Sequence, residues 1–453
     1  MRGDLQPPND RDKYAATLAA RIFRCLMAVA VKFGLKAVQL DAINTFINGI
    51  LDETVYTYQP EGFGVPGKVC WLLRALYGLR RSPLIWLNEF SKTLKELGLT
   101  QVPESPCLFT SGRLVVFFYV DDVVILYPPE YEADYITFKE QLLNRYEFKD
   151  LGDLKWFLGI RVIRSETKLW LCQDSYIEKI AASFNLIKGP RFNTPMDTVM
   201  NAASANLDQA TDQQIHLYQA LVGSIGYAVI NTRPDSARAN NKLAEFLTNP
   251  SPEHIEAAQR IIRYLYDTRY LAIEYSKEGG SDQVNPDLHC SADAAYADDT
   301  DTRKSTEGFL FKLFGGPIDW HSSKQKAVTR SSTEAELLAL SHASTQLYWW
   351  RRFFDQIKLQ LDEYKVLCDN QQTIRIVSTP AIKLATKLKH IDVHQHWMRQ
   401  EVAEKRLQIE WISTDKMTSD GFTKALTAQK HQAFIRQLGL VDIRHLIEES
   451  SLN

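Results

Sequence analysis

The sequence predicts an α+β protein of more than one domain. Its 453 residues are enough for two or three domains that each bury a core. Strand-like and helix-like apolar periodicities both occur along the chain, and a stretch rich in Gly, Ser and Asp at 278–287 is the best linker candidate. Hydrophobic residues make up 45% and charged residues 24%, which is typical of a globular protein and argues against disorder.

Apolar periodicity also predicts the order of the elements. In the first half we expect helices at 15–33, 86–97, 131–146, 174–184, 217–230 and 252–267. Strands are expected at 35–40, 114–127, 156–164 and 168–172, and a loop at 59–68. Beyond the linker candidate we expect strands at 288–292, 308–313, 318–320, 365–369 and 408–412, a long helix at 333–357 and a closing helix.

Composition limits the compartment and the partners. The longest apolar runs are too short or too interrupted to span a bilayer, and the N-terminal residues lack the apolar core of a signal peptide. We therefore expect no membrane partner and a location in the cytoplasm or the nucleus. Six cysteines without a close pair are expected to be reduced core residues. A net charge of −2 means that any nucleic-acid-binding surface must be local.

The most apolar stretch of the chain, 114–127, contains two adjacent carboxylates, Asp121 and Asp122. Its composition predicts two buried strands joined by a tight turn at 120–122, so both acids lie at the tip of a hairpin. A divalent cation would offset the cost of holding two like charges beside apolar strands. A solvated turn is the alternative, because Asp favours turns in any protein. Asp41, at the end of the predicted strand 35–40, is a third carboxylate of interest.

A second set of acids lies beyond the linker candidate. Asp293 and Asp369 end predicted strands, Glu336 lies in the first turns of the long helix, and Asp420 opens the last helix. Glu334 is two residues from Glu336, about 200° around the helix, so only one of them can face a shared site. The buried side marked by the following leucines favours Glu336. Each acid alone also fits a helix cap or a surface charge, and the case for a site depends on the whole set.

Ten short motifs along the chain resemble those of one family. In the first half these are QLDAINTFINGILDETVYTYQPEGF at 39–63, LLRALYGLRRSPLIW at 72–86, YVDD at 119–122, LGDLKWFLGI at 151–160 and YQALVGSIGYAVINTRPD at 218–235. In the second half they are SADAAYADD at 291–299, SSTEAELLAL at 331–340, LCDNQQTI at 367–374, KHIDVHQHW at 389–397 and TSDGFTKAL at 418–426. The chain resembles the reverse transcriptase and RNase H region of copia-type (Pseudoviridae) LTR retrotransposon Pol polyproteins.

The resemblance implies a polymerase site in the first half. Asp41, Asp121 and Asp122 match the family's metal-binding triad, which uses two Mg²⁺ ions, with Mn²⁺ as a substitute, to join dNTPs to a DNA primer on an RNA or DNA template. Phe46 matches an aromatic gate against the ribose 2′-OH, although a core phenylalanine is an equal alternative. Four further positions are implied to contact substrate: Tyr77, Gly78, Arg81 and Tyr119. Arg81 departs from the family, in which many relatives carry Gln.

The resemblance implies a ribonuclease site in the second half. Asp293, Glu336, Asp369 and Asp420 match four acids that bind two Mg²⁺ ions and cut the RNA strand of an RNA/DNA hybrid. Three lysines form a local basic run that fits backbone contact or a solvated helix face: Lys383, Lys387 and Lys389. Three histidines invite a zinc assignment that we do not make, because no cysteine or carboxylate completes a tetrahedral set nearby: His390, His394 and His396.

The resemblance also implies a domain order. We expect an N-terminally truncated fingers and palm at 1–172, a thumb or connection at 173–283 and an RNase H-like α/β domain at 284–450. Family members begin their fingers upstream with a basic strand, most of which precedes the first residue here, so we expect the triphosphate grip to be incomplete. The alternative to an active reverse transcriptase is a catalytically silent remnant or a co-opted nucleic-acid-binding protein. In the family these enzymes act inside virus-like particles; the oligomeric state is not implied.

Overall fold

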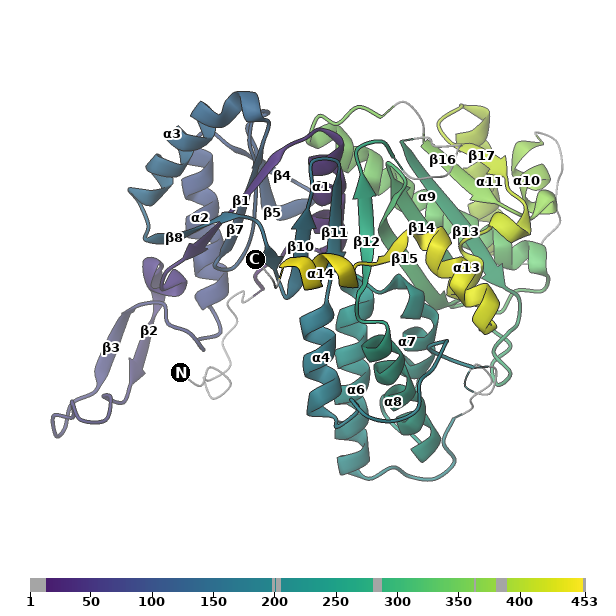
Figure 1. Cartoon of the computed structure of the whole chain (residues 1–453), viewed down its shortest axis with the longest axis horizontal. Coiled ribbons are helices and arrows are strands. Elements are labelled where there is room, and N and C mark those ends of the chain that lie inside the picture. The colour runs from purple at the N-terminus through teal and green to yellow at the C-terminus, as the bar shows by residue number, and fades with distance from the viewer. Residues whose placement is uncertain are drawn as a thin grey trace. The chain divides into compact units, whose positions relative to one another are not determined.

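The chain folds into two compact units (Figure 1). The computed structural model describes residues 14–197, 200, 205–279, 287–361, 364–379 and 389–450. The first unit consists mainly of residues 33–154, and the second of residues 20–32, 155–351 and the chain from 360 onward. The compact units therefore divide at 154/155, whereas we predicted a boundary at 172/173. The three-domain division stays a prediction.

The first unit is built on a six-stranded sheet of order β4-β5-β6-β7-β1-β8. Its strands are β1 (Lys36–Ala42), β4 (Thr100–Val102), β5 (Ser105–Thr110), β6 (Val115–Tyr119), β7 (Asp122–Tyr127) and β8 (Phe148–Asp153). The helices of this unit are α2 (Ser82–Glu96) and α3 (Glu132–Leu143). Helix α2 packs on the sheet through Phe90, whose ring meets that of Phe118 edge-on at 4.9 Å. This contact closes the core beneath the central strands, because both rings are fully buried.

The predicted hairpin at 114–127 is confirmed as β6 and β7. The two strands pair in antiparallel register from Val115 opposite Leu126 to Tyr119 opposite Asp122. Val120 takes φ 58°, a left-handed conformation that is unusual for a β-branched residue. The indole N–H of Trp86 donates to the carbonyl oxygen of Val120 at 2.8 Å. Helix α2 therefore holds the tight turn that carries the two acids.

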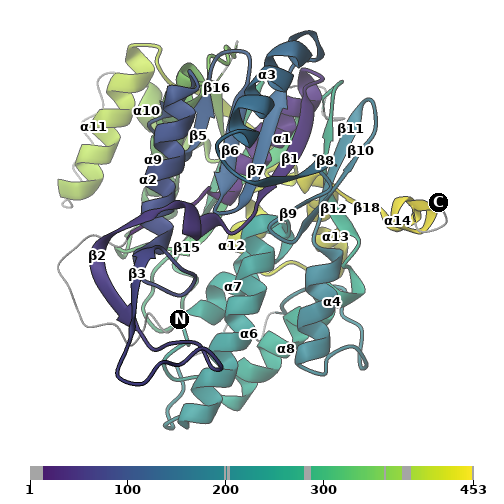
Figure 2. The same ribbon diagram turned by 90° about the vertical axis from the view of Figure 1, so that its left-hand side faces the viewer.

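A two-stranded ribbon extends from the first unit (Figure 2). Its strands are β2 (Ile50–Thr57) and β3 (Cys70–Arg74), and the predicted loop at 59–68 joins them. We did not predict either strand. In β2, exposed and partly buried residues alternate along the whole strand, and the exposed positions include Ile50 and Tyr56. Apolar periodicity did not predict this strand, because apolar side chains lie on its exposed face.

The second unit contains a five-stranded antiparallel sheet of order β18-β12-β11-β10-β9. Its strands are β9 (Trp156–Phe157), β10 (Ile160–Arg164), β11 (Lys168–Cys172), β12 (Leu271–Ser276) and β18 (Leu440–Asp442). The accompanying helices are α1 (Ala20–Lys32), α4 (Asp174–Ser183), α6 (Asp212–Asn231), α7 (Ala237–Ala244) and α8 (Pro252–Asp267). Strand β11 pairs with β12, so residues before 172 are joined to much later segments. This pairing explains why the compact units do not divide at residue 172.

A mixed five-stranded sheet completes the second unit, in the order β15-β14-β13-β16-β17. Strands β13 (Leu288–Ala295), β14 (Thr306–Leu313) and β15 (Gly316–Lys324) are antiparallel, whereas β16 (Tyr364–Cys368) and β17 (Gln408–Trp411) run parallel to β13. The helices are α9 (Ser332–Gln356), α10 (Gln371–Ser378), α11 (Lys389–Ala403), α12 (Asp420–Thr423), α13 (Ala428–Leu438) and α14 (Arg444–Ser450). Because β13 and β16 are parallel neighbours, Asp293 on β13 lies close to Asp369, which directly follows β16.

The N-terminal helix α1 belongs to the second unit. Arg24 on α1 is buried, and its guanidinium donates to the carbonyl oxygens of Ile318 at 2.8 Å and Asn231 at 2.9 Å. These bonds join α1 to β15 and to the end of α6. In the described part of the chain no helix is long and apolar enough to cross a membrane. The periodicity predicted α1 but could not show which sheet it covers.

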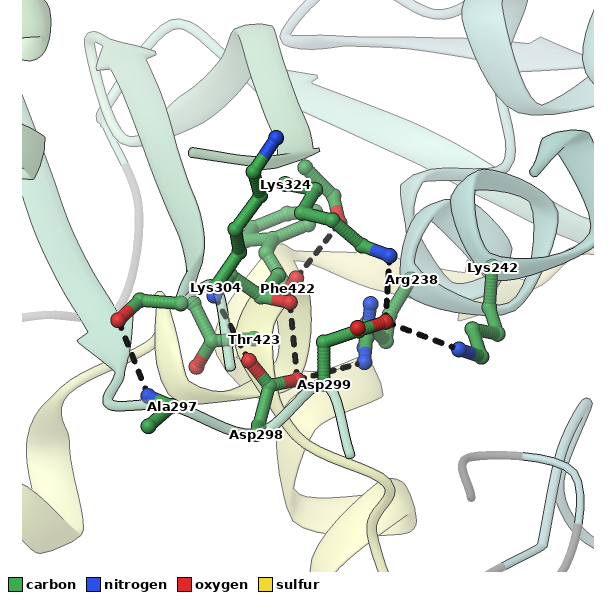
Figure 3. Close-up of polar contacts among 12 residues, drawn as sticks. Arg238, Lys242, Ala297, Asp298, Asp299, Lys304, Lys324, Phe422 and Thr423 are labelled. Atoms are coloured by element: carbon green, nitrogen blue, oxygen red, sulfur yellow. Dashed lines mark hydrogen bonds and ion pairs between the residues drawn. The ribbon is translucent and has the colours of Figure 1, made fainter. Parts of the chain in front are cut away.

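A polar network joins α7 to the loop after β13 and to β15 (Figure 3). Arg238 pairs with Asp298 at 2.9 Å, and Lys242 lies 3.6 Å from Asp299. Lys324 on β15 pairs with Asp299 as well. The side chain of Asp299 is 6% exposed, and Glu245 also pairs with both lysines, so removing the charge of Asp299 leaves two ammonium groups that share one carboxylate. This network fixes the loop that follows the strand bearing Asp293.

We predict that Asp299→Asn lowers the free energy of unfolding by about 1–3 kcal/mol at pH 7. Burial opposes ionisation of Asp299, but hydrogen bonds from Lys324 and Thr302 outweigh it and lower the carboxyl pKa. The stabilisation is therefore present above the ordinary carboxyl pKa and disappears as pH falls through the lower folded-state value. Urea unfolding at pH 7 and at low pH measures this difference, with exposed Asp208→Asn as the control. An equal loss at both pH values would contradict the prediction.

Candidate functional site

Three of the four acids predicted in the second half converge. Asp293, Glu336 and Asp369 each offer a carboxylate oxygen, and these oxygens all lie within 4.8 Å of one another. Strand β16 ends at Cys368, so Asp369 directly follows the strand that we expected it to end. Asp293 was expected at the end of its strand, but β13 continues to Ala295, because the residues after the acid still pair with β14. Neighbouring strands therefore supply two acids, and a helix supplies the third.

Helix α9 turns Glu336 rather than Glu334 into this cluster. Glu336 is 7% exposed and belongs to the three-carboxylate group. Glu334, two residues earlier, accepts a hydrogen bond from the backbone N–H of Arg330 at 2.7 Å. Helix geometry predicted this division, since residues two apart face different directions. The two glutamates provide a matched pair of positions on one helix.

The cluster is electrostatically unfavourable without a cation. Burial, together with the charges of Asp293 and Asp369, raises the pKa of Glu336 to about 9. Burial likewise raises the pKa of Asp293 to about 6. The positive charge of Lys424 lowers this pKa, whereas the negative charge of Asp420 raises it further. The Oε2 atom of Glu336 is buried and has no hydrogen-bond partner. Carboxylate oxygens in this arrangement are the ligands that hard divalent cations prefer, so the donor set fits Mg²⁺.

The fourth acid, Asp420, is held by a lysine. It is the first residue of α12, and its Oδ1 accepts from Nζ of Lys424 at 2.5 Å. The same Nζ lies 3.6 Å from Oδ2 of Asp293. Thr423 donates its hydroxyl proton to Oδ2 of Asp293. We did not predict Thr423 or Lys424, although both follow Asp420 at helical spacing in the motif TSDGFTKAL.

Short polar contacts hold α12 on the sheet. Ser419 Oγ donates to Ser291 Oγ at 2.6 Å, and Ser322 Oγ donates to the carbonyl oxygen of Phe422 at 2.7 Å. Phe422 and Thr423 are drawn in Figure 3. A methyl group at Gly308 would lie 2.5 Å from Cβ of Phe422, so only glycine lets the helix approach β14 this closely. These contacts set where Thr423 and Asp420 stand relative to Asp293.

Asp369 is the least buried acid of the three, and the segment after β17 holds it. Thr414 Oγ1 donates to Oδ2 of Asp369 at 2.9 Å. The indole N–H of Trp411 donates to the backbone carbonyl of Asp369 at 3.1 Å. Neither residue was predicted, since nothing in the local sequence indicates that β17 lies beside β16.

The hairpin acids of the first unit lie opposite Asp41. Strands β1 and β7 pair with Asp41 directly opposite Asp122, and the N–H of Ala42 donates to the carbonyl oxygen of Asp121 at 2.9 Å. Burial raises the pKa of Asp122, as do the charges of Asp121 and Asp41, whereas a hydrogen bond from Gln39 at 2.9 Å lowers it. Within the described residues, the three carboxylates do not form a group as close as the one in the second unit.

The predicted nucleotide contacts all lie in the first unit, and two of them touch. Phe46 is 7% exposed, and its ring centroid is 4.5 Å from that of Tyr77, which is 49% exposed. Gly78 takes φ 89°, which favours glycine at the turn before α2. Arg81 pairs with Asp52 at 2.5 Å, so part of its charge is neutralised. Tyr119 is the last residue of β6 and is partly buried. Their roles as a gate and as substrate contacts stay predictions.

The predicted basic run lies mostly outside the described residues. Lys383 and Lys387 are outside them, and α11 begins at Lys389, whose side chain is not described. The same holds for the side chain of His390. His394 Nδ1 shares a hydrogen bond of 2.7 Å with Ser341 Oγ.

Comparison with known proteins identifies the family of the chain. Residues 6–198 match the family model described as reverse transcriptase (RNA-dependent DNA polymerase). The chain is 34% identical over 431 residues to the retrovirus-related Pol polyprotein from transposon TNT 1-94 of Nicotiana tabacum, which is 92% of this chain and 32% of that one. Its identity to the Pol polyprotein from transposon RE1 of Arabidopsis thaliana is 32%, over 95% of this chain and 29% of that one. It thus spans about a third of either polyprotein's length.

A shorter relative is matched over its full length. A putative transposon Ty5-1 protein of Saccharomyces cerevisiae is 31% identical over 322 residues, which cover 68% of this chain and 100% of that protein. The family-model match shows a reverse transcriptase domain within residues 6–198, and the mixed sheet of the second unit follows it along the chain. The chain belongs to the copia-type retrotransposon Pol polyprotein family.

Two solved structures match part of the chain at low similarity. LC11-RNase H1 in complex with RNA/DNA hybrid has 18% identity and a TM-score of 0.24, covering 30% of this chain and 93% of that one. The N-terminal RNase H domain of a Mycobacterium tuberculosis protein has 16% identity and a TM-score of 0.23, covering 34% of this chain and 98% of that one. At these scores neither match carries an argument about this chain.

We predict that Glu336→Gln raises the free energy of unfolding of the metal-free protein by about 1–3 kcal/mol at pH 8. The folded-state pKa of Glu336 lies above its ordinary value, at about 9, so the native state holds the proton more tightly. Stability without metal therefore falls as pH rises from the ordinary carboxyl pKa toward that value, and the substitution removes the part of this fall that Glu336 contributes. Urea unfolding in EDTA from pH 5 to pH 9 measures it. The control is Glu334→Gln, and an unchanged pH profile in Glu336→Gln would contradict the prediction.

Proposed function

We propose that this chain is a retrotransposon reverse transcriptase with RNase H activity, using two Mg²⁺ ions in each site. The observation that carries the proposal is the cluster of Asp293, Glu336 and Asp369 in the second unit. Oxygens of three carboxylates lie within 4.8 Å of one another, and two of these acids are buried. Their mutual repulsion and lost hydration destabilise the fold unless a cation binds between them. Buried carboxylates with strongly shifted pKa values are typical of functional sites, where the chemistry and not stability favours such residues.

The proposed ribonuclease site would hold its metal between residues of known position. Asp293, Glu336 and Asp369 would bind Mg²⁺, or Mn²⁺ in its place, and Asp420 lies next to them. Bound Mg²⁺ supplies Lewis-acid polarisation of a phosphate and a water of lowered pKa. The chain's own residues orient the ligands: Thr423 fixes one oxygen of Asp293, and Thr414 fixes one of Asp369. Burial of Glu336 keeps bulk water from one side of the cluster.

RNA in an RNA/DNA hybrid is the proposed substrate of this site. The support is the strand order of the mixed sheet and the family of the chain. Proteins that cut only the RNA strand distinguish it through the 2′-OH groups in the minor groove. The hybrid is also the product that an RNA-directed DNA polymerase makes, so both activities serve one process.

The proposed polymerase site uses Asp41, Asp121 and Asp122. Its support is the pairing of Asp41 with Asp122 across β1 and β7, at the tip of the hairpin that α2 holds. The proposed substrates are dNTPs, a DNA primer and an RNA or DNA template. A catalytically silent remnant is a second candidate for this half. The wider spacing of the three carboxylates favours it, since they do not form a close group.

We predict that the protein degrades the RNA of a hybrid in Mg²⁺ and that Glu336→Gln lowers the rate at least about 100-fold, since removing a single catalytic group costs rates of that order. A fluorescently labelled RNA strand annealed to DNA, resolved on a denaturing gel, measures cleavage. The matched control is Glu334→Gln, two residues away on the same helix, which should keep nearly the full rate. Equal rates for both variants, or no cleavage by the wild type, would refute the ribonuclease proposal.

We predict that primer extension on an RNA template depends on Asp121. Asp121→Asn should abolish incorporation of dNTPs, because the amide cannot supply the charge that a metal ion requires. Exposed Asp134→Asn, on α3 of the same unit, is the control. If the wild type and Asp121→Asn are equally silent while hybrid cleavage persists, the polymerase proposal fails and this half is a silent remnant.

A further inference from the structure

Lys424 is placed as a cation inside the acidic site. Its ammonium nitrogen lies 2.5 Å from Oδ1 of Asp420 and 3.6 Å from Oδ2 of Asp293. Among the described residues, no other Lys, Arg or His lies within 4.0 Å of the carboxylates of Asp293, Glu336, Asp369 or Asp420. One ammonium group thus pairs with two of the four acids. This lysine lies four residues after Asp420, directly beyond the end of α12.

The backbone and the side chain of Lys424 differ in freedom. Its backbone is extended, at φ −126° and ψ 150°, and the preceding Thr423 is buried and hydrogen-bonded to Asp293. The attachment point is therefore fixed beside the acids. The side chain itself is 45% exposed, and its charged end makes both ion pairs. A flexible four-carbon stem on a fixed backbone can move its ammonium group out of the site at little cost.

We propose that Lys424 is a built-in counter-cation that holds Asp293 and Asp420 together while the site is free of metal and that competes with the metal for these two carboxylates. The inference rests on the proposed metal-binding function of the cluster. It assigns Lys424 a positioning role and not a catalytic one. The lysine neutralises one side of the cluster, where Asp420 lies, and leaves the unpartnered oxygen of Glu336 on the other side without a cation.

Two consequences follow, one from competition with the metal and one from the ion pairs that Lys424 makes when no metal is bound. The site should bind its divalent cation more weakly than the acids alone would, because binding must displace an ammonium group or tolerate its repulsion. The metal-free site should also keep its shape, since the lysine prevents the acids from moving apart. Lys424 therefore sets the Mg²⁺ concentration at which the site fills.

The test is Mg²⁺ binding to the full chain by isothermal titration calorimetry at pH 8. All variants carry Asp121→Asn and Asp122→Asn, so that the first unit contributes no site. Lys424→Met removes the charge and keeps the length of the side chain, and we expect its Mg²⁺ dissociation constant to be about 3- to 10-fold lower than that of the parent. Lys424→Arg keeps the charge and should bind like the parent. Exposed Lys430→Met, on α13, is the control and should also bind like the parent.

The outcomes separate the inference from the function beneath it. If the parent binds Mg²⁺ and Lys424→Met binds equally or more weakly, the competition inference is wrong while the metal site stands. If neither protein binds Mg²⁺, or if Glu336→Gln leaves the titration of the parent unchanged, both the inference and the proposed metal site fail. Tighter binding in Lys424→Met but not in Lys424→Arg supports competition by charge. Equal tightening in both would show that shape, and not charge, limits binding, and would also overturn it.

Discussion

Carboxylates clustered in the second unit repel one another, and the rest of that unit must hold them together against this repulsion. Asp293, Glu336 and Asp369 come from β13, α9 and the end of β16, and each of these elements is held by contacts away from the acids. The network around Asp299 fixes the loop after β13, and the bond between Ser419 and Ser291 fixes α12. The fold thus brings like charges together at a cost that only a cation can offset.

The two halves of the chain treat their acids differently. In the second unit the carboxylates are close, largely buried and partly compensated by Lys424. In the first unit the acids lie at the tip of a hairpin whose turn needs a left-handed Val120 and a hydrogen bond from Trp86. Strain of this kind persists only where surrounding contacts enforce it, and it is common at functional sites. The acids of the first unit are therefore distinguished by the backbone conformation of their turn, whereas those of the second unit are distinguished by their close, buried carboxylates.

Sequence reasoning recovered the main framework but not the supporting contacts. The hairpin at Asp121 and Asp122 follows from its uninterrupted apolar flanks, and the inward position of Glu336 follows from helix geometry. The family resemblance was confirmed by relatives of similar sequence. Strands β2 and β3 were missed because their apolar residues face outward. Lys424, Thr414 and Trp411 were missed because their roles depend on which strands and loops become neighbours, and periodicity carries no such information. The same limit explains why the division at residue 172 differs from that of the compact units.

We propose that the acids of the second unit form a divalent metal site in which Lys424 pairs with Asp293 and Asp420 when no metal is bound. Anomalous scattering from Mn²⁺ in crystals soaked at millimolar concentration tests this most directly. We expect anomalous peaks beside the carboxylates of Asp293, Glu336 and Asp369, with the ammonium group of Lys424 turned away from Asp293. Crystals that bind Mn²⁺ elsewhere but show no peak at these carboxylates would contradict it.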